Sequence, residues 1–206
     1  MIKNLLFDLG GVIMNLDRNR CVKALEALGL AEADEMLGIA VQKGPFGQLE
    51  SGQIGPDEFR NEIRARIGRP VSDSDIDGAL NRFLLGIPVQ RLQQLRQLRE
   101  RYGVYMLSNT NPIMWNSFIA DQFRQEGREV GDYFDGIVTS FEARCMKPSA
   151  EIFDYAARTL GIAPGETLFL DDAEVNCRAA EALGWHAALV APGREFMDIL
   201  HEQKLI

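Results

Sequence analysis

Histidine and cysteine are scarce in this sequence of 206 residues, which contains two histidines and three cysteines. Zinc sites are built mainly from these two residue types, so a histidine-rich zinc site is excluded. The cysteines, Cys21, Cys145 and Cys177, are odd in number and share no metal-ligand spacing, which favours a reducing compartment over a disulfide framework. Any metal ion bound by this chain is therefore expected to have oxygen ligands.

Basic residues are also too few for a nucleic-acid-binding protein. The 30 acidic residues outnumber the 22 basic ones and give a formal net charge of −8. Phosphate backbones are bound through clustered lysine and arginine, and the sequence has no such cluster. We therefore expect no nucleic-acid partner.

Long apolar runs are absent as well. No run approaches the ~18 residues that a membrane-spanning helix needs. The apolar start is too short for a signal peptide, because Asp8 interrupts it. Together with the cysteine usage, this predicts a cytoplasmic protein without a membrane partner.

What the sequence does contain is a series of short, mostly apolar runs. They cover residues 2–7, 104–107, 136–139, 167–170 and 186–190. Continuous apolar runs are typical of strands that are buried on both faces of a parallel sheet. Single helical patterns separate the later runs, which implies right-handed crossovers and an α/β fold with a doubly wound parallel sheet.

The first crossover is interrupted by a segment with helical patterns and no convincing strand. These patterns include residues 31–40, 56–67 and 72–84, and the last begins with Ser72 and Asp75 spaced as a capping box. We therefore expect an α/β core of residues 1–16 and 85–206 and an all-helical cap of residues 17–84. Both ends of the cap must return to the same sheet edge, so the cap should overhang that edge.

Polar residues follow the predicted strands at the edge where ligands bind in open α/β sheets. They are Asp8, Ser108 with Asn109, Lys147 before Pro148, and Asp171 with Asp172. Two glycines, Gly10 and Gly11, follow the first aspartate and allow the backbone to turn tightly and approach a ligand. The sequence thus predicts one polar site at the carboxyl edge of the sheet.

These side chains have the chemistry that phosphoryl transfer needs. A carboxylate such as Asp8 can accept a phosphoryl group as a nucleophile, which splits one difficult transfer into two easier ones. Attack of one anion on another requires charge neutralisation, and Mg²⁺ is typically held by one or two carboxylates, here Asp8 with Asp171 or Asp172. The Ser108 hydroxyl and the Lys147 ammonium can hold the remaining phosphoryl oxygens.

Over almost its whole length the chain resembles the haloacid dehalogenase-like hydrolase superfamily. The resemblance lies in the motifs Phe7-Asp8-Leu9-Gly10-Gly11-Val12, Leu107-Ser108-Asn109, Lys147-Pro148 and Leu170-Asp171-Asp172. It implies a Rossmann-like core with an inserted helical cap, and a phosphatase in which Asp8 forms an aspartyl-phosphate. It further implies Mg²⁺ bound by Asp8, the Gly10 carbonyl and Asp171, with Asp172 orienting the water shell, and phosphate bound by Ser108, Asn109 and Lys147.

One position departs from the family pattern. Most phosphatases of this family carry a second aspartate two residues after the nucleophile, where it protonates the leaving group and later activates water, but this chain has Gly10. General acid–base catalysis is typically worth ~10²–10⁴ in rate. We therefore expect a preference for activated phosphates such as glycosyl 1-phosphates or acyl phosphates, in keeping with a likeness to the sugar-1-phosphate phosphatase branch.

The sequence does not say what replaces the missing acid or what selects the substrate. Asp17 or a cap residue could supply the acid, and the candidates for substrate selection are Arg20, Phe46, Gln48 and Glu50. The expected substrate is a small phosphorylated metabolite.

Two other functions stay open at this point. A 2-haloacid dehalogenase needs no leaving-group acid, because halide departs unprotonated, but a metal-free dehalogenase has no use for the Asp171-Asp172 pair. A phosphoryl-binding or regulatory protein that has lost turnover is the second alternative, and Gly10 is compatible with it.

Overall fold

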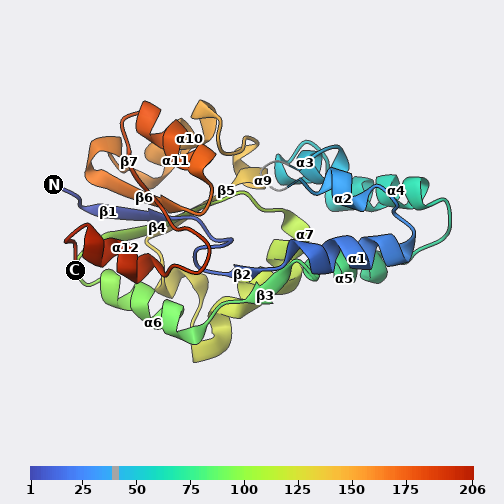
Figure 1. Ribbon diagram of the computed structural model, residues 1–206, viewed down its shortest axis with the longest axis horizontal. Coiled ribbons are helices and arrows are strands. Elements are labelled where there is room, and N and C mark those ends of the chain that lie inside the picture. Colours follow the sequence, from blue (N-terminus) through green and yellow to red (C-terminus); the bar gives the residue numbers. More distant parts are fainter. Residues whose placement is uncertain (39–41) are drawn as a thin grey trace.

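The computed structural model describes residues 1–38 and 42–206, and its core is a five-stranded parallel sheet in the order β5-β4-β1-β6-β7 (Figure 1). The strands are β1 (Asn4–Phe7), β4 (Gly103–Ser108), β5 (Gly136–Thr139), β6 (Thr167–Asp171) and β7 (His186–Leu189). The central β1 is the first strand of the chain. The order confirms the predicted doubly wound sheet.

Helices cover both faces of this sheet. On one face lie α10 (Ala150–Leu160) and α11 (Glu174–Ala182), and on the other lie α6 (Val89–Leu98) and α12 (Phe196–Glu202) (Figure 1). Within β1, Leu6 packs into the first layer, whereas Leu5 and Phe7 pack into the second. Burial on both faces explains why the strands are continuously apolar in sequence.

A helical path of mixed geometry follows β4. It consists of α7 (Pro112–Met114), the π-helical turn η1 (Trp115–Ile119), α8 (Ala120–Gln122) and the 3₁₀ turn η2 (Phe123–Glu126). Asn111 caps its start, since its Oδ1 accepts a hydrogen bond from the Met114 backbone N–H at 3.0 Å. The remaining short helical elements of the core are η3 (Val130–Asp132), α9 (Ser140–Ala143) and η4 (Pro164–Glu166).

Helices α1 to α5 form the inserted cap. Their bounds are α1 (Arg18–Leu28), α2 (Ala33–Met36), α3 (Pro45–Glu50), α4 (Pro56–Ile67) and α5 (Asp73–Asn81). The helix predicted over residues 31–40 extends only over α2, and its residues 39 and 40 lie outside the described part of the chain. The helix predicted up to residue 84 ends earlier, because residues 84–86 pair with another strand.

An antiparallel ribbon joins the cap to the core. It pairs β2 (Asn15–Leu16) with β3 (Leu84–Gly86), next to the cap boundaries predicted at residues 17 and 84. Asp17 begins α1 as its N-cap and accepts a hydrogen bond from the Arg20 backbone N–H at 3.2 Å. The division into a core domain of residues 1–16 and 85–206 and a cap domain of residues 17–84 stays a prediction.

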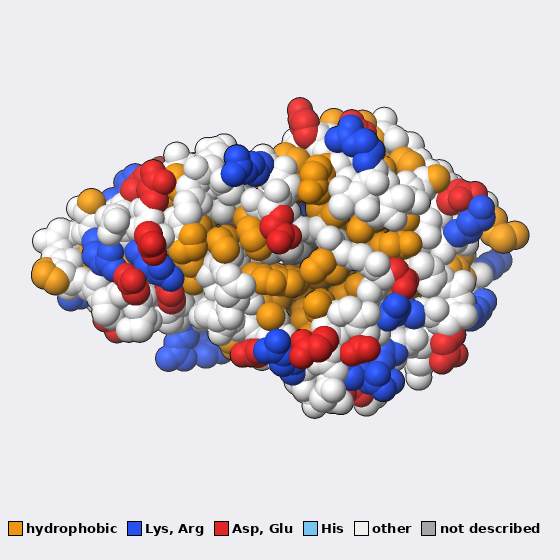
Figure 2. Space-filling view, turned by 180° about the vertical axis from the view of Figure 1, so that it is seen from behind, with side chains coloured by type: hydrophobic (Ala, Val, Ile, Leu, Met, Phe, Trp, Pro, Cys, Tyr) orange, Lys and Arg blue, Asp and Glu red, His pale blue; other side chains and the backbone are white. Residues whose placement is uncertain are grey.

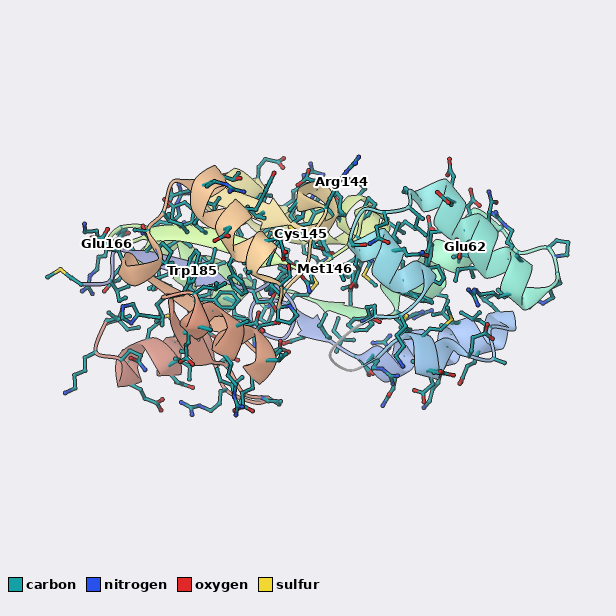
Figure 3. All side chains as sticks on the ribbon, turned by 90° about the horizontal axis from the view of Figure 1, so that it is seen from above. Glu62, Arg144, Cys145, Met146, Glu166 and Trp185 are labelled. Carbon is teal, nitrogen blue, oxygen red and sulfur yellow. The ribbon has the colours of Figure 1, made fainter. Side chains whose placement is uncertain are left out.

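The cap also touches the core directly, beyond the ribbon. Gly52 follows α3 with φ +65°, and a Cβ at this position would lie 2.2 Å from the Phe141 carbonyl oxygen on α9. Hydrophobic side chains gather in the middle of the face shown in Figure 2, between the charged ends of the molecule. In Figure 3, Arg144, Cys145 and Met146 lie near the middle of the molecule, on the side of the core that faces the cap, and they line a groove together with Ser51 and Gln53 of the cap.

Within the described residues, no helix combines the length and the apolarity that crossing a bilayer requires.

Substitution of Phe153 by Ala should destabilise the core strongly. Phe153 is fully buried on α10, with its ring centroid 5.5 Å from Phe169 and 6.0 Å from Trp185. We expect Phe153→Ala to lower the free energy of unfolding by about 3–5 kcal/mol, measured by urea denaturation. Val175→Ala, at a side chain that is 45% exposed, should change it by less than about 0.5 kcal/mol, and equal effects would contradict the assigned core.

Candidate functional site

The carboxyl edge of the sheet brings the four sequence motifs together. Asp8 follows β1 directly, Ser108 ends β4, Asp171 ends β6, and Lys147 lies on the loop after α9. All four side chains are buried, and Asp171 has no exposed surface. Side chains of opposite charge are therefore enclosed together, which makes their pairing decisive for both stability and chemistry.

Lys147 is the centre of this cluster. Its Nζ donates to Asp8 Oδ1 at 2.7 Å, to Asp171 Oδ2 at 2.7 Å and to the Leu107 carbonyl oxygen at 3.0 Å. Burial by itself lowers the pKa of Lys147, but the Asp171 and Asp8 carboxylates outweigh it and raise that pKa above its ordinary value. Lys147 is therefore a fixed positive charge at any physiological pH.

The ionised form of Asp8 is less strongly favoured than that of Lys147. Burial raises the pKa of Asp8 to about 7, and Asp171 and Asp172 add to the rise, while Lys147 opposes it. A cation bound beside Asp8 would favour its ionised, nucleophilic form.

Three carboxylates at this edge can hold such a cation. One oxygen from each of Asp8, Asp171 and Asp172 lies within 4.8 Å of the others. Asp171 is held in place because its Oδ1 accepts hydrogen bonds from the Ala173 backbone N–H at 2.8 Å and from Asn176 Nδ2 at 3.0 Å. A donor set made of oxygens fits Mg²⁺, as the sequence predicts.

Gly11 makes room for one of these carboxylates. It has φ +76°, and a Cβ on it would lie 2.1 Å from Asp172 Oδ2. The sequence indicated only that the glycine pair permits a tight turn, whereas the structure shows that position 11 must lack a side chain for Asp172 to occupy its place.

Asn109 joins two of the motifs. Its Nδ2 donates to the Lys147 carbonyl oxygen at 2.9 Å, and its Oδ1 accepts from the Lys147 backbone N–H at 3.0 Å. The side-chain amide of Asn109 is thus hydrogen-bonded to the Lys147 backbone. The predicted contact of Asn109 with phosphate stays a prediction. Among the described residues, the Ser108 hydroxyl makes only a long 3.4 Å contact with the Asn109 carbonyl oxygen and is available to a ligand.

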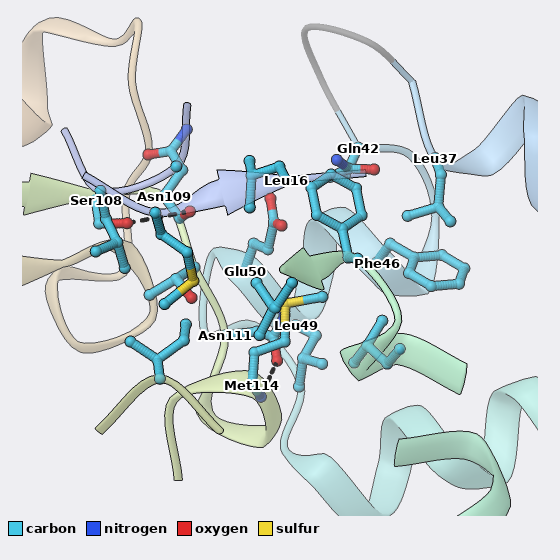
Figure 4. Close-up of a pocket in the computed structure, with 18 residues that line it drawn as sticks. Leu16, Leu37, Gln42, Phe46, Leu49, Glu50, Ser108, Asn109, Asn111 and Met114 are labelled. Carbon is cyan, nitrogen blue, oxygen red and sulfur yellow. Dashed lines mark hydrogen bonds between the residues drawn. The ribbon is translucent and has the colours of Figure 1, made fainter. Parts of the chain in front are cut away.

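Two adjoining cavities open beside these residues. The polar one is lined by Asp8, Lys147, Asn109, Asp172, Asn176 and Glu50, among others. The second is mostly apolar and contains Leu9, Met14, Leu49, Phe83 and Ser108 (Figure 4). Six residues line both cavities and lie where the two adjoin: Gly10, Leu16, Gln42, Glu50, Phe83 and Asn109.

The cap residues predicted to select the substrate divide into two groups. Phe46 and Glu50 line the apolar cavity, whereas Arg20 and Gln48 line neither cavity. Asp17, a candidate for the missing acid, is occupied as the N-cap of α1 and also lines neither. Gln42 lines both cavities and was not indicated by the sequence, because no local pattern distinguishes it.

Glu50 differs from Asp8 and Asp171 in having no partner for its carboxyl group among the described residues. Burial raises the pKa of Glu50 to about 8, and the described residues include no ion pair or hydrogen bond to its carboxyl group. In Figure 4 its side chain points into the cavity near Leu16.

Comparison with known proteins identifies the family. A model of the haloacid dehalogenase-like hydrolases matches residues 2–184. The D-ribitol-5-phosphate phosphatase of Bacteroides thetaiotaomicron is 38% identical over 185 residues, which make up 90% of each chain. This chain belongs to the haloacid dehalogenase-like hydrolases.

Solved structures of this hydrolase family agree. A family enzyme from B. thetaiotaomicron in complex with magnesium and inorganic phosphate superposes with a TM-score of 0.90 at 42% identity, over 97% of this chain and 99% of the other. The L-2-haloacid dehalogenase RSc1362 superposes with a TM-score of 0.63 at 18% identity, over 98% of this chain and 99% of the other, which shows the shared fold alone.

Removing the central charge should destabilise this hydrolase strongly. Lys147→Met leaves the buried Asp8 and Asp171 carboxylates without a cation, so we expect a loss of about 3–5 kcal/mol in the free energy of unfolding in EDTA. Urea denaturation with Lys23→Met, an exposed lysine on α1, provides the control. If the two variants unfold alike, the buried ion pair has no such role.

A methyl group at position 11 should weaken metal binding. Gly11→Ala places a Cβ where Asp172 Oδ2 lies, and displacing a supporting group of this kind typically costs ~10–100-fold in metal affinity. Isothermal titration with Mg²⁺ measures the change. Gly78→Ala, where a Cβ meets open space, should bind Mg²⁺ as the wild type does. Unchanged affinity in Gly11→Ala would argue against a metal beside Asp172.

Proposed function

We propose that this protein is a cytoplasmic, Mg²⁺-dependent phosphatase that hydrolyses a small phosphorylated metabolite through an aspartyl-phosphate on Asp8. The observation that carries the proposal is the position of the Asp8 carboxylate, 2.7 Å from the Lys147 ammonium and grouped with the carboxylates of Asp171 and Asp172. Such a site combines a nucleophile, a fixed cation and the ligands for a second cation.

In the first step, an Asp8 oxygen attacks phosphorus, the bond from phosphorus to the leaving oxygen breaks, and Asp8 carries the phosphoryl group. Lys147 and the Ser108 hydroxyl hold phosphoryl oxygens as charge develops on them. In the second step, water attacks phosphorus and frees Asp8. Asp8, the Gly10 carbonyl and Asp171 would hold Mg²⁺, and Asp172 would orient its water shell. The ion would supply the positive charge that lets one anion approach another.

The lining of the cavities limits the substrate. Among the described residues that line them, Lys147 is the only basic one, and its charge is shared between two carboxylates. A substrate with one phosphate and an uncharged remainder fits this wall, whereas a second anionic group would lack a partner. A sugar or sugar-alcohol phosphate meets this description, and the relative that acts on D-ribitol 5-phosphate supports that class.

The three grouped carboxylates also favour phosphate ester hydrolysis over hydrolysis of a carbon–halogen bond. Three carboxylates within 4.8 Å of one another repel strongly unless a cation joins them, and a metal-free dehalogenase has no need of the arrangement. Activity on 2-chloropropionate that survives EDTA would favour the dehalogenase.

Steady hydrolysis of p-nitrophenyl phosphate is the basic test. We expect turnover with Mg²⁺ that EDTA abolishes and that Asp8→Asn lowers by at least ~10³-fold, since no second nucleophile replaces the carboxylate. Asp154→Asn, an exposed aspartate on α10, should keep wild-type activity. Phosphate binding without any turnover would instead favour the regulatory, phosphoryl-binding alternative.

A further inference from the structure

The position at which phosphatases of this family carry their acid is occupied by Gly10 in this chain, and the Leu16 side chain lies beside it. A Cβ on Gly10 would lie 2.8 Å from Cδ1 of Leu16, the second residue of β2. A side chain at position 10 therefore requires Leu16 to move. If the leaving group is protonated here, the proton must come from elsewhere in the cavity wall.

Few groups in that wall can provide a proton. Among the described residues lining the two cavities, the carboxylic acids are Asp8, Asp172 and Glu50. Asp8 is the nucleophile of the proposed reaction, and Asp172 lies against Gly11 within the group of potential metal ligands. Lys147 is paired with two carboxylates and stays charged. Glu50 is the one acid that no other task occupies.

The fold places Glu50 in the wall through contact between the cap and the core. It is the last residue of α3, and Ser51, which follows it, is buried and donates its hydroxyl to the Gln48 carbonyl oxygen at 3.2 Å. Gly52 then packs against the Phe141 carbonyl oxygen. The Glu50 carboxyl group thus reaches the site only from a cap that is packed against the core, with Gly10 and Leu16 on the same boundary between the two cavities.

The environment of Glu50 keeps its proton in place. No cation is paired with it in the described structure, and burial raises its pKa to about 8. At neutral pH the side chain is therefore mainly a neutral carboxylic acid that can give up a proton. A pKa near the working pH also suits a group that must donate a proton and then accept one.

We propose that Glu50 is the general acid and base of this hydrolase, delivered by the cap in place of the missing aspartate at position 10. This inference rests on the proposed phosphatase function. As Asp8 bonds to phosphorus and the ester bond breaks, Glu50 gives its proton to the leaving oxygen, which departs as an alcohol. Water then attacks the aspartyl-phosphate and gives its proton to the Glu50 carboxylate, which restores the acid and releases phosphate.

This assignment changes the expected substrate. The preference for activated phosphates was expected because position 10 lacks a general acid. If Glu50 is the acid, we expect that preference in a variant without Glu50 and not in the wild-type protein. With Glu50 present, the substrates include phosphate esters of ordinary alcohols, whose alkoxides are poor leaving groups without a proton.

The test compares two substrates of nearly the same shape on wild-type protein and Glu50→Gln, each with Mg²⁺. Phenyl phosphate has a poor leaving group and p-nitrophenyl phosphate a good one. We expect Glu50→Gln to lower kcat/KM for phenyl phosphate by ~10²–10⁴-fold and to change it far less for p-nitrophenyl phosphate. Because the variant also lacks the base for the second step, p-nitrophenol should appear as a rapid burst followed by slow turnover.

Glu62→Gln is the matched control, since Glu62 lies on α4 in the cap and away from the cavities (Figure 3). It should behave as the wild type with both substrates. An equal loss of kcat/KM for both substrates in Glu50→Gln, without a burst, would assign Glu50 to binding or structure and overturn the proposal, as would no loss at all. A wild type that hydrolyses neither substrate would overturn the phosphatase function together with the role of Glu50.

Discussion

The ion pairs of Lys147 with Asp8 and Asp171 are the interaction on which the rest of the structure depends. Each has an N–O distance of 2.7 Å in a site with almost no exposed surface, where an unpaired charge costs several kcal/mol. The chain surrounds these pairs with fixed partners: Asn109 holds the Lys147 backbone, and Asn176 holds Asp171. The same geometry that stabilises the core also leaves a nucleophile beside a cation.

The two parts of the molecule have different tasks in this account. The core supplies charge from the ends of parallel strands, whose positions are fixed by backbone hydrogen bonds and by burial on both faces. The cap supplies apolar walls and one carboxylic acid, Glu50, which is neutral because burial disfavours its charge. In this account the core alone provides the nucleophile, Asp8, for attack on phosphorus. The cap, packed against the core, provides the acid, Glu50, for departure of the leaving group.

The parallel sheet and the polar residues at its carboxyl edge could be predicted from the sequence alone. Continuous apolar runs report burial on both faces, and parallel strands bring their ends together, so Asp8, Ser108, Lys147 and Asp171 could be grouped in advance. What could not be predicted depends on contacts between segments far apart in the chain. Four features arise only when the cap and the loops pack against the strands: the position of Glu50 in the cavity wall, the position of Gln42, the need for Gly11 beside Asp172, and the hydrogen bonds of Asn109 to the Lys147 backbone.

The central claim is that Asp8 carries the phosphoryl group during turnover. Rapid acid quenching of the wild-type protein with p-nitrophenyl phosphate and Mg²⁺, followed by peptide mass spectrometry, measures this directly. The account predicts an acid-trapped phosphoryl group on the peptide that contains Asp8, at that residue, and none in Asp8→Asn. A phosphoryl group on any other residue, or steady turnover with no covalent phosphate at any time point, would contradict it.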